Sequence, residues 1–490
     1  MSSKNHSNDK NLEADIVVVG GGGAGMPAAT IASEAGVKNI IILETRPALG
    51  GNAMMAGGMF AVETPPQKRA GVDYSRDQAF KDKMDYSNWT VDPRVVRAHI
   101  NVTAEVIQWL ENKGVQFQLR GTEIPGGFYP KVNHSPIPEK GERKGLGRTM
   151  VEICTKDCQK LGVKILMETT GKKLITDKKG KVTGIVATKD GKDINIKAKA
   201  VIIAAGGFSG NKKMMDKYLP TKGFRLSLSL PHKGEGILMA EEVGAIIDDC
   251  ATTFFIGPHH YPYTHSLTQL LRRPEIVWVN KRGERFCDES PFLGRQHQTG
   301  HPLVRQPGEI CYGLIDTNKL ADMIAKKDPS GGMGGAEWFD KVYDDFKIDI
   351  KKGVAKISDS WDDIAQFIGA KPEVLKATVE QYNTYCDNGY DYDMLKDKKF
   401  LFPLRTPPFY VILGRNGFDA TFGGIKINER MEVINTQYDP IPGLYAAGNN
   451  AGSAINVNYH PKHVGTSLSF AICSGYLAGK SAAKYVLGKG

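Results

Sequence analysis

Apolar runs that end in glycine clusters recur along the chain and predict buried parallel strands. Three such runs are Ala14–Val19 before Gly20, Val201–Ala205 before Gly206, and Gly443–Ala447 before Gly448. Short apolar runs bounded by glycine are typical of strands that are buried on both faces of a sheet. The middle of the chain is helical and polar in pattern, and the strand pattern returns at Phe409–Gly424. The sequence therefore predicts an α/β fold in which both chain ends form one domain and the middle forms another.

The first apolar run leads into Gly20–Gly25, which fits the pattern G-x-G-x-x-G of a dinucleotide-binding turn. A helix with a small-residue face follows, and a second strand, Asn39–Leu43, ends at Glu44. The three glycines allow a tight turn, close approach of a pyrophosphate to the backbone, and close packing of helix on strand. Glu44 lies 19 residues after Gly25 and can accept hydrogen bonds from ribose hydroxyls. The set predicts nucleotide binding, and the alternative is a glycine-rich turn without a ligand.

Composition narrows the class of protein. A chain of 490 residues is too long for one compact domain, so two or more are expected. No apolar run approaches the roughly 20 residues that span a bilayer. The seven cysteines are scattered without a Cys-x-x-Cys pair, which predicts a reducing, cytoplasmic compartment. Much of the lysine behind the net charge of +10 lies in Lys172–Lys199, which has no interleaved aromatic residues, so a solvated face is favoured over a nucleic-acid site.

Three longer motifs relate the chain to a known family. They are Val279–Glu289 (VNKRGERFCDE), Gly234–Ala245 (GEGILMAEEVGA) and Thr378–Asn383 (TVEQYN). With these motifs and the glycine turn, the chain resembles the FAD-dependent flavoproteins of the fumarate reductase/succinate dehydrogenase type, which include the 3-ketosteroid dehydrogenases. The resemblance extends from Asp15 to Val486.

The resemblance implies an α/β fold with a Rossmann-like FAD-binding domain built from both chain ends and an inserted α+β capping domain. The implied boundaries are 12–256 and 400–490 for the FAD-binding domain and 257–399 for the capping domain. The membrane-bound relatives attach FAD through a histidine before the second glycine pair. No histidine lies between Pro47 and Gly58, so noncovalent FAD is expected here.

The residues expected to line the FAD site come from several segments of the chain. Asn449 stands where the family usually has a glutamate, and Ser467 opens the last helix, whose N-terminus would favour negative charge at the flavin C2 oxygen. The complete set is Gly20, Gly22, Ala24, Gly25, Glu44, Thr45, Gly50, Gly51, Asn52, Ala53, Gly57, Gly58, Ala205, Gly206, Gly448, Asn449, Ser467 and Leu468.

The resemblance also implies catalytic positions. Fumarate reductases hold two carboxylates and donate a proton from an arginine. Thr268 matches the threonine of the substrate clamp, Arg272 matches the relay arginine, and Arg295 matches the proton-donor arginine. The family chemistry is hydride transfer between flavin N5 and a carbon of an activated double bond, with proton transfer at the neighbouring carbon.

Several family positions differ in this chain. Gln269 replaces the relay glutamate, Ala420 replaces the clamp histidine, and Lys462 replaces the second clamp arginine. Loss of a charge-assisted bond to a buried carboxylate costs about 1.5–3 kcal/mol. We therefore expect a CH–CH oxidoreductase that interconverts an α,β-unsaturated carbonyl or carboxylate compound with its saturated form, and for which fumarate itself is a poor substrate.

Two candidate residues have open alternatives. Tyr459 resembles the ketone-polarising tyrosine of the ketosteroid dehydrogenases, or it is a packed tyrosine with a satisfied hydroxyl group. His260, together with His259 and His265, faces substrate at the domain junction, or these histidines are structural. A metal site is not expected, because no carboxylate or thiolate partners lie at suitable spacing.

The electron partner is expected to be a separate molecule. The sequence has no haem or iron–sulfur spacing of cysteines and no second dinucleotide-binding unit. The direction of the reaction stays open. The alternatives are a dicarboxylate reductase with a rebuilt clamp, a 3-ketosteroid-type dehydrogenase, a flavin electron-transfer subunit and a nucleotide-binding scaffold.

Overall fold

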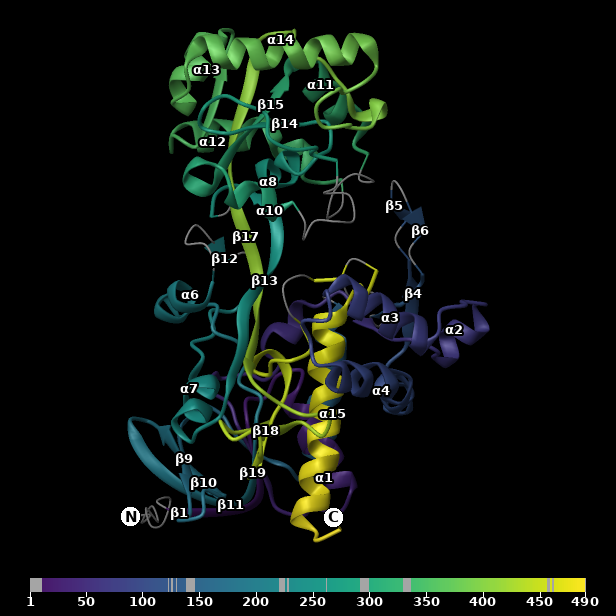
Figure 1. Cartoon of the computed structure of the whole chain (residues 1–490), viewed down its shortest axis with the longest axis vertical. Coiled ribbons are helices and arrows are strands. Elements are labelled where there is room, and N and C mark those ends of the chain that lie inside the picture. The colour runs from purple at the N-terminus through teal and green to yellow at the C-terminus, as the bar shows by residue number, and fades with distance from the viewer. Residues whose placement is uncertain are drawn as a thin grey trace, which may run out of the picture.

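The chain is elongated, with one main β-sheet towards each end (Figure 1). The computed structural model describes residues 11–121, 123–124, 127–128, 130–137, 146–219, 225–226, 229–260, 262–290, 299–328, 336–455, 459–460 and 462–489. The long strands β13 (Ile247–His259) and β17 (Phe409–Ile425) run along the middle of the molecule, between the two ends.

The sheet at the lower end of Figure 1 takes strands from both ends of the chain. Among the described strands its order is β18-β19-β11-β1-β2-β8, and the hairpin of β9 and β10 extends from β11. Val19 of β1 pairs in parallel with Ile203 of β11 and with Leu43 of β2, and β11 pairs in parallel with β19. The α/β prediction with a parallel sheet is confirmed. The strands are β1 (Asn11–Val19), β2 (Ile40–Leu43), β8 (Lys164–Leu166), β9 (Thr169–Thr176), β10 (Val182–Lys189), β11 (Lys192–Ile203), β18 (Glu432–Ile434) and β19 (Pro440–Ala446).

Two helices from opposite ends of the chain pack together beside this sheet. They are α1 (Gly25–Glu34) and α15 (Thr466–Val486). A Cβ at Gly475 would lie 2.1 Å from the Ala24 carbonyl oxygen, and a Cβ at Gly479 would lie 2.4 Å from that of Ala28. Because only glycine fits at these two positions, the small residues of α1 and α15 set how closely the helices approach.

The sheet at the upper end combines strands of the middle segment with β17. Among the described strands its order is β12-β17-β15-β14, and β13 and β16 also pair with β17. Its other strands are β12 (Arg225–Leu226), β14 (Val277–Val279), β15 (Ile310–Asp316) and β16 (Ala355–Ser358). The helices around it are α8 (His265–Leu271), α10 (Gly300–Val304), α11 (Thr317–Lys326), α12 (Val342–Ile350), α13 (Trp361–Ile368) and α14 (Pro372–Asn388).

β17 joins the two ends of the molecule. Its first half, including Phe409 and Val411, belongs to the same apolar clusters as β15 and the helices around it. Its second half, including Phe422 and Ile425, belongs to the large core of the lower sheet. One strand therefore carries the chain from one hydrophobic core to the other.

The motif Val279–Glu289 stabilises the upper end. Arg285 Nε lies 3.0 Å from Glu289 Oε1, and Lys396 Nζ lies 3.0 Å from Glu289 Oε2. Arg285 also pairs with Asp391 at 2.6 Å, and the four side chains are almost completely buried. Removing one partner from such a buried network leaves an unpaired charge, so the motif is explained by folding without a direct role in a site.

Further helices and strands complete the described chain. They are η1 (Gly51–Met55), β3 (Met59–Phe60), α2 (Pro65–Arg69), α3 (Arg76–Tyr86), α4 (Pro93–Asn112), β4 (Phe117–Arg120), β5 (Glu123–Ile124), β6 (Gly127–Phe128), β7 (Asn133–Pro136), α5 (Leu146–Lys160), α6 (Lys212–Tyr218), α7 (Glu235–Glu242), η2 (Pro307–Glu309), η4 (Phe339–Lys341), η5 (Lys398–Phe400) and η6 (Gly448–Asn450). Within the described ranges, no helix is both long enough and apolar enough to cross a membrane.

Candidate active site

Four segments that are far apart in the sequence meet at one edge of the lower sheet. β1, β2, β11 and β19 are parallel neighbours, so their carboxyl ends lie together. The segments that follow these ends are Gly20–Gly25, Glu44–Thr45, Ala204–Gly206 and Gly448–Asn449. Ligands of parallel α/β sheets bind outside the carboxyl ends of the strands. The structure thus brings together segments that the sequence indicated only one at a time as candidates for cofactor binding.

The glycine turn has one face that is closed by packing and one that is open. Gly20 has φ 105°, and a Cβ there would lie 2.4 Å from the Ala204 carbonyl oxygen. A Cβ at Gly25 would lie 1.8 Å from the Gly20 carbonyl oxygen. At Gly22, by contrast, the nearest atom to an added Cβ is the Gly50 carbonyl oxygen, 3.8 Å away. The outer glycines are therefore needed for packing, and the backbone at Gly22 is accessible to a ligand.

Two other predicted segments lie against this turn. A Cβ at Gly23 would lie 2.9 Å from Ala53 Cβ in η1 and 3.6 Å from Leu468 Cδ1 at the start of α15. A Cβ at Gly448 would lie 3.0 Å from Ala24 Cβ. The cofactor candidates near residues 50, 448 and 468 therefore converge on the N-terminus of α1.

The loop before α7 also reaches the site, which the sequence did not predict. The backbone N–H of Leu230 donates to Asn52 Oδ1 at 2.9 Å. Gly206, with φ 85°, lies so close to His232 that an added Cβ would be 2.9 Å from His232 Nδ1. Gly57 is exposed, and an added Cβ there would meet no atom within 4 Å.

Glu44 supports the turn with both carboxylate oxygens. Oε2 accepts the Gly21 N–H at 2.9 Å, and Oε1 accepts the Arg46 N–H at 2.9 Å. A carboxylate offers about four acceptor positions, so two remain for the hydroxyls of a ribose. Thr45 beside it is exposed. The open backbone at Gly22, the α1 N-terminus and the free acceptor positions of Glu44 together fit an adenine dinucleotide.

Tyr459 lies at the start of α15 and is buried. The Ser467 N–H donates to its hydroxyl oxygen at 3.0 Å, so the side chain satisfies one of the exposed amides of the helix start. Burial raises the pKa of Tyr459 to about 12. The hydroxyl group is thus protonated at neutral pH, and its oxygen is engaged by the helix, as the packed-tyrosine alternative requires.

Arg272 is the centre of a buried basic cluster beside α8. Its Nε donates to the Pro258 carbonyl oxygen at 3.4 Å, and burial lowers its pKa to about 10, against an opposite effect of Asp419. Burial and the charge of Arg272 lower the pKa of His259 to about 3, and the same two causes lower that of His265. One guanidinium among neutral imidazoles is suited to one carboxylate or to a polarised carbonyl oxygen.

Gln269 lies in the same cluster and is the residue that replaces the relay glutamate. Its Nε2 lies 3.4 Å from His265 Nε2, and its Oε1 is buried with no hydrogen-bond partner among the described residues. An unpartnered buried amide oxygen is unusual in a folded protein. It is suited to accept a hydrogen bond from a ligand and cannot relay a proton as a carboxylate would.

Thr268 and His260 are engaged in holding α8. Thr268 Oγ1 donates to the Thr264 carbonyl oxygen at 3.3 Å. His260 Nδ1 lies 2.7 Å from the Leu413 carbonyl oxygen, and its Nε2 lies 3.1 Å from Asp349 Oδ2. Both ring nitrogens of His260 thus have protein partners, as the structural alternative for this histidine requires.

The remaining catalytic candidates lie apart from α8 or outside the described residues. Lys462 Nζ pairs with Asp82 Oδ2 at 3.3 Å, beside α3, and its side chain is half exposed. Ala420 is buried in the core of the lower sheet. Arg295 lies outside the described residues. Within the described ranges no group of three or more metal-ligating side chains comes together.

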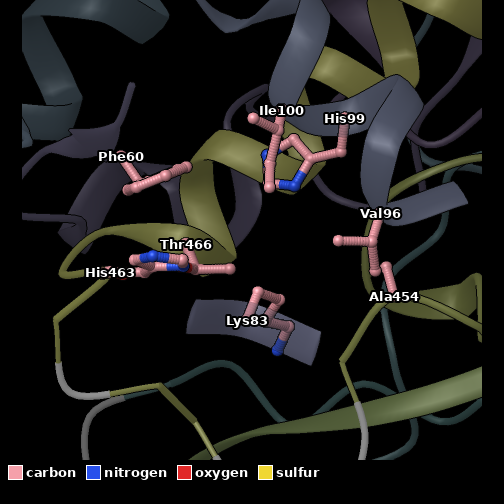
Figure 2. Close-up of a pocket in the computed structure, with 8 residues that line it drawn as sticks. All are labelled: Phe60, Lys83, Val96, His99, Ile100, Ala454, His463 and Thr466. Carbon is pink, nitrogen blue, oxygen red and sulfur yellow. The ribbon is translucent and has the colours of Figure 1, made fainter. Parts of the chain in front are cut away.

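A buried basic pocket near the start of α15 was missed by the sequence. Figure 2 shows its lining from four parts of the chain: Phe60 of β3, Lys83 of α3, Val96, His99 and Ile100 of α4, and Ala454, His463 and Thr466 near the C-terminus. Lys83 is 4% exposed, and its Nζ has no hydrogen-bond partner among the described residues. Burial lowers its pKa to about 8.

One local signal could have identified Lys83. It follows Ala79 by four residues and precedes Met84, and these three residues are the buried face of α3. Residues four apart lie on the same face of a helix, so a lysine at this spacing interrupts an apolar stripe. The pattern indicates a buried charge, but it does not identify the neighbours.

Comparisons with known proteins agree with this geometry. A family model described as an FAD binding domain matches residues 15–464. The chain is similar to vinyl phenol reductase of Lactiplantibacillus plantarum, with 29% identity and coverage of 97% of both chains. Its structure is similar to the open conformation of a flavocytochrome c3 fumarate reductase, with a TM-score of 0.75 and 27% identity over 97% of this chain and 79% of that chain. It is also similar to 3-ketosteroid-Δ4-(5α)-dehydrogenase from Rhodococcus jostii, with a TM-score of 0.75 and 25% identity over 98% and 99% of the chains.

Proposed function

Because this chain belongs to the family of FAD-binding flavoproteins that includes fumarate reductases and 3-ketosteroid dehydrogenases, we propose that it reduces a C=C bond conjugated to one carboxylate or one ketone. The protein is an FAD-dependent oxidoreductase of CH–CH bonds. When bound, the flavin supplies hydride chemistry at N5. The residues of this chain bind the cofactor, orient the substrate and move a proton.

The cofactor-binding roles follow from the edge of the lower sheet. The backbone at Gly22 and the N-terminus of α1 approach the pyrophosphate, and Glu44 accepts hydrogen bonds from the ribose hydroxyls. The segment Gly50–Gly58 and the start of α15 line the flavin ring, where the positive end of the helix dipole favours negative charge. The bound FAD is noncovalent, because no histidine lies between Pro47 and Gly58.

The proposed substrate class rests on the positions at which this chain lacks the carboxylate-binding residues of the family. Ala420 is buried in an apolar core and has no polar group to offer. Lys462 is paired with Asp82 and half exposed, so it would have to leave that ion pair to hold a carboxylate.

Two buried guanidinium groups, those of Arg272 and Arg273, lie at the end of α8 in the described part of the chain. Arg273 is paired with Glu275 at 2.9 Å, which leaves Arg272 as the candidate to hold a substrate oxygen. With one guanidinium group available to bind substrate oxygen atoms, a substrate with one carboxylate or one ketone is favoured over a dicarboxylate.

Proton transfer is assigned to Arg295 by resemblance. Tyr459, which is protonated at neutral pH, supports the N-terminus of α15 through the Ser467 N–H. Thr268 and His260 keep α8, and with it Arg272, in position.

The proposed division of the chain is an FAD-binding domain of residues 12–256 and 400–490 and a capping domain of residues 257–399, with β17 passing between them. The proposed compartment is the cytoplasm, since six of the described cysteines are free thiols. The electrons are proposed to come from a separate donor.

A panel of oxidants tests the substrate class. The reduced holoenzyme is mixed anaerobically with unsaturated monocarboxylates, enones, vinyl phenols and fumarate, and flavin reoxidation is followed by absorbance. We expect at least one compound with a single carboxylate, ketone or phenol group to reoxidise the flavin at least about tenfold faster than fumarate. The reason is that fumarate would lose about 1.5–3 kcal/mol of charge-assisted binding at its second carboxylate. Fumarate as the fastest oxidant would refute the substrate class. No reoxidation by any compound would favour an electron-transfer subunit.

A further inference from the structure

The Lys83 pocket holds a positive charge for which the described structure provides no counter-charge. The ammonium is buried and unpartnered, and burial is the cause that lowers its pKa to about 8. The neighbouring acid, Asp82, is already bound by Tyr74, Gln78 and Lys462. The adjoining sequence Ile455–Lys462 contains no acidic residue. A lysine in this setting is costly unless a partner of opposite charge joins it.

The hydrogen bonds around the pocket place a proton on Nε2 of each of its two histidines, and burial keeps both rings neutral. Ser469 Oγ donates to the Phe60 carbonyl oxygen, so it accepts from His99 Nε2, 2.8 Å away. Tyr74 donates to Asp82, so its oxygen accepts from His463 Nε2, 2.9 Å away. Burial lowers the pKa of His99 to about 3 and that of His463 well below its usual value, and the charge of Lys83 contributes to both shifts. Neither ring neutralises the ammonium.

The pocket also lies at the positive end of a long helix. Thr466, which lines it, is the first residue of α15, and this helix of 21 residues directs the positive end of its dipole to the same region. Phe60 stacks on His463 at 4.4 Å between ring centroids and forms an apolar wall. The cavity has room for about one water-sized group. The charge of Lys83, the dipole of α15 and the size of the cavity together favour a small anion as the ligand.

We propose that the pocket formed by Lys83, His99, His463 and the start of α15 binds a small monovalent anion, either a halide or one carboxylate group. The anion neutralises the Lys83 ammonium and accepts its hydrogen bonds. Lys83, His99 and His463 are not among the residues proposed above to hold FAD or substrate. Thr466 directly precedes Ser467 and Leu468, which are assigned to the flavin, so the pocket adjoins the proposed FAD site but does not depend on the proposed substrate class.

Salt-dependent melting of the FAD-loaded protein tests the site. Sodium chloride, bromide or acetate is titrated at constant ionic strength, balanced with sodium gluconate, whose anion is too large for the cavity. We expect the melting temperature of the wild type to rise in a saturable way by roughly 2 °C. Lys83→Met removes the charge and keeps the length of the side chain, and it should abolish the rise. Lys81→Met on the exposed face of the same helix should retain it, because the side chain of Lys81 is 69% exposed.

The two anion sources give different results. If the melting temperature rises in a saturable way with halides alone, the ligand is an inorganic anion. If it also does so with acetate, the ligand is the carboxylate of a small organic acid. An equal salt response in the wild type and Lys83→Met would overturn the proposal, as would a response that never saturates. If Lys83→Met fails to fold, anomalous diffraction from bromide-soaked crystals of the wild-type holoenzyme decides. A bromide peak beside Lys83 Nζ supports the site, and bromide bound elsewhere but absent from this pocket rejects it.

Discussion

At the scale of single residues, the start of α15 is surrounded by basic side chains whose pKa values are lowered by burial. Burial lowers the pKa of Lys83 to about 8 and that of His460 to about 3, and the charge of Lys83 adds to the shift at His460. His460 Nε2 donates to the Asp82 carbonyl oxygen at 3.0 Å. Three histidines, His99, His460 and His463, and two lysines, Lys83 and Lys462, therefore lie close to one acid, Asp82, in the described part of the chain.

This arrangement predicts that Lys83→Met stabilises the protein at neutral pH when halide is low. A folded-state pKa of about 8, against 10.5 in the unfolded chain, means that the charged lysine is disfavoured by folding. At about 1.4 kcal/mol per pKa unit, the variant should gain about 3 kcal/mol of unfolding free energy at pH 7. The penalty in the wild type is complete below pH 8 and disappears as the pH rises towards 10.5. Denaturant unfolding at pH 7 and pH 10.5 measures it, and a gain of equal size at both pH values would contradict this account.

At the scale of elements, close contact between α1 and α15 depends on glycine. Gly475 and Gly479 lie against the backbone of Ala24 and Ala28. The contact brings Leu468 at the start of α15 to the dinucleotide turn at Gly23. Glycine is unfavourable in an exposed helix, so its presence twice in α15 is explained by this close approach.

Gly479→Ala is therefore expected to lower the unfolding free energy by about 1–3 kcal/mol, because the added Cβ would lie 2.4 Å from the Ala28 carbonyl oxygen. Ser481→Ala, two residues later on the same helix, is the control. It should raise stability by a few tenths of a kcal/mol through helix propensity. Thermal melting of both variants measures the difference. A stabilising Gly479→Ala would show that the helices do not pack this closely.

At the scale of the whole molecule, the cofactor candidates and the buried arginine of the substrate candidates belong to different sheets. The cofactor candidates lie at the carboxyl edge of the lower sheet, whereas Arg272 directly follows α8, which lies beside the upper sheet. Asp349 of α12 holds α8 by accepting the Thr264 N–H at 3.0 Å and by its contact with His260 at 3.1 Å. Damage to α8 should thus affect turnover without affecting the cofactor.

Asp349→Asn tests this separation. The substitution removes a buried acceptor charge, so α8 and Arg272 should shift, and turnover with the best substrate should fall by about tenfold or more. The ratio of flavin to protein absorbance should stay that of the wild type. Asp344→Asn on the same helix is the control, because Asp344 is exposed and pairs only with Lys347 in the described structure. Loss of flavin in Asp349→Asn would show that the two ends are not independent.

The fold and the cofactor could be predicted because their signals are local. The tight turn at Gly20, the packing at Gly25 and the acid at Glu44 occupy fixed offsets along one strand, one helix and one more strand. The substrate side was harder to predict. Thr268 and His260 have the residue types expected of a site, but their hydrogen-bonding groups are used by Thr264, Leu413 and Asp349, which no sequence spacing reveals.

The sequence by itself determined the α/β sheet, the dinucleotide turn and the family, because each depends on periodicity and spacing within short segments. The tertiary structure alone decided which side chains share a buried space. Lys83 and His463 are separated by 380 positions, yet they line one pocket, and the cost of burying a charge depends on those neighbours and not on the order of residues.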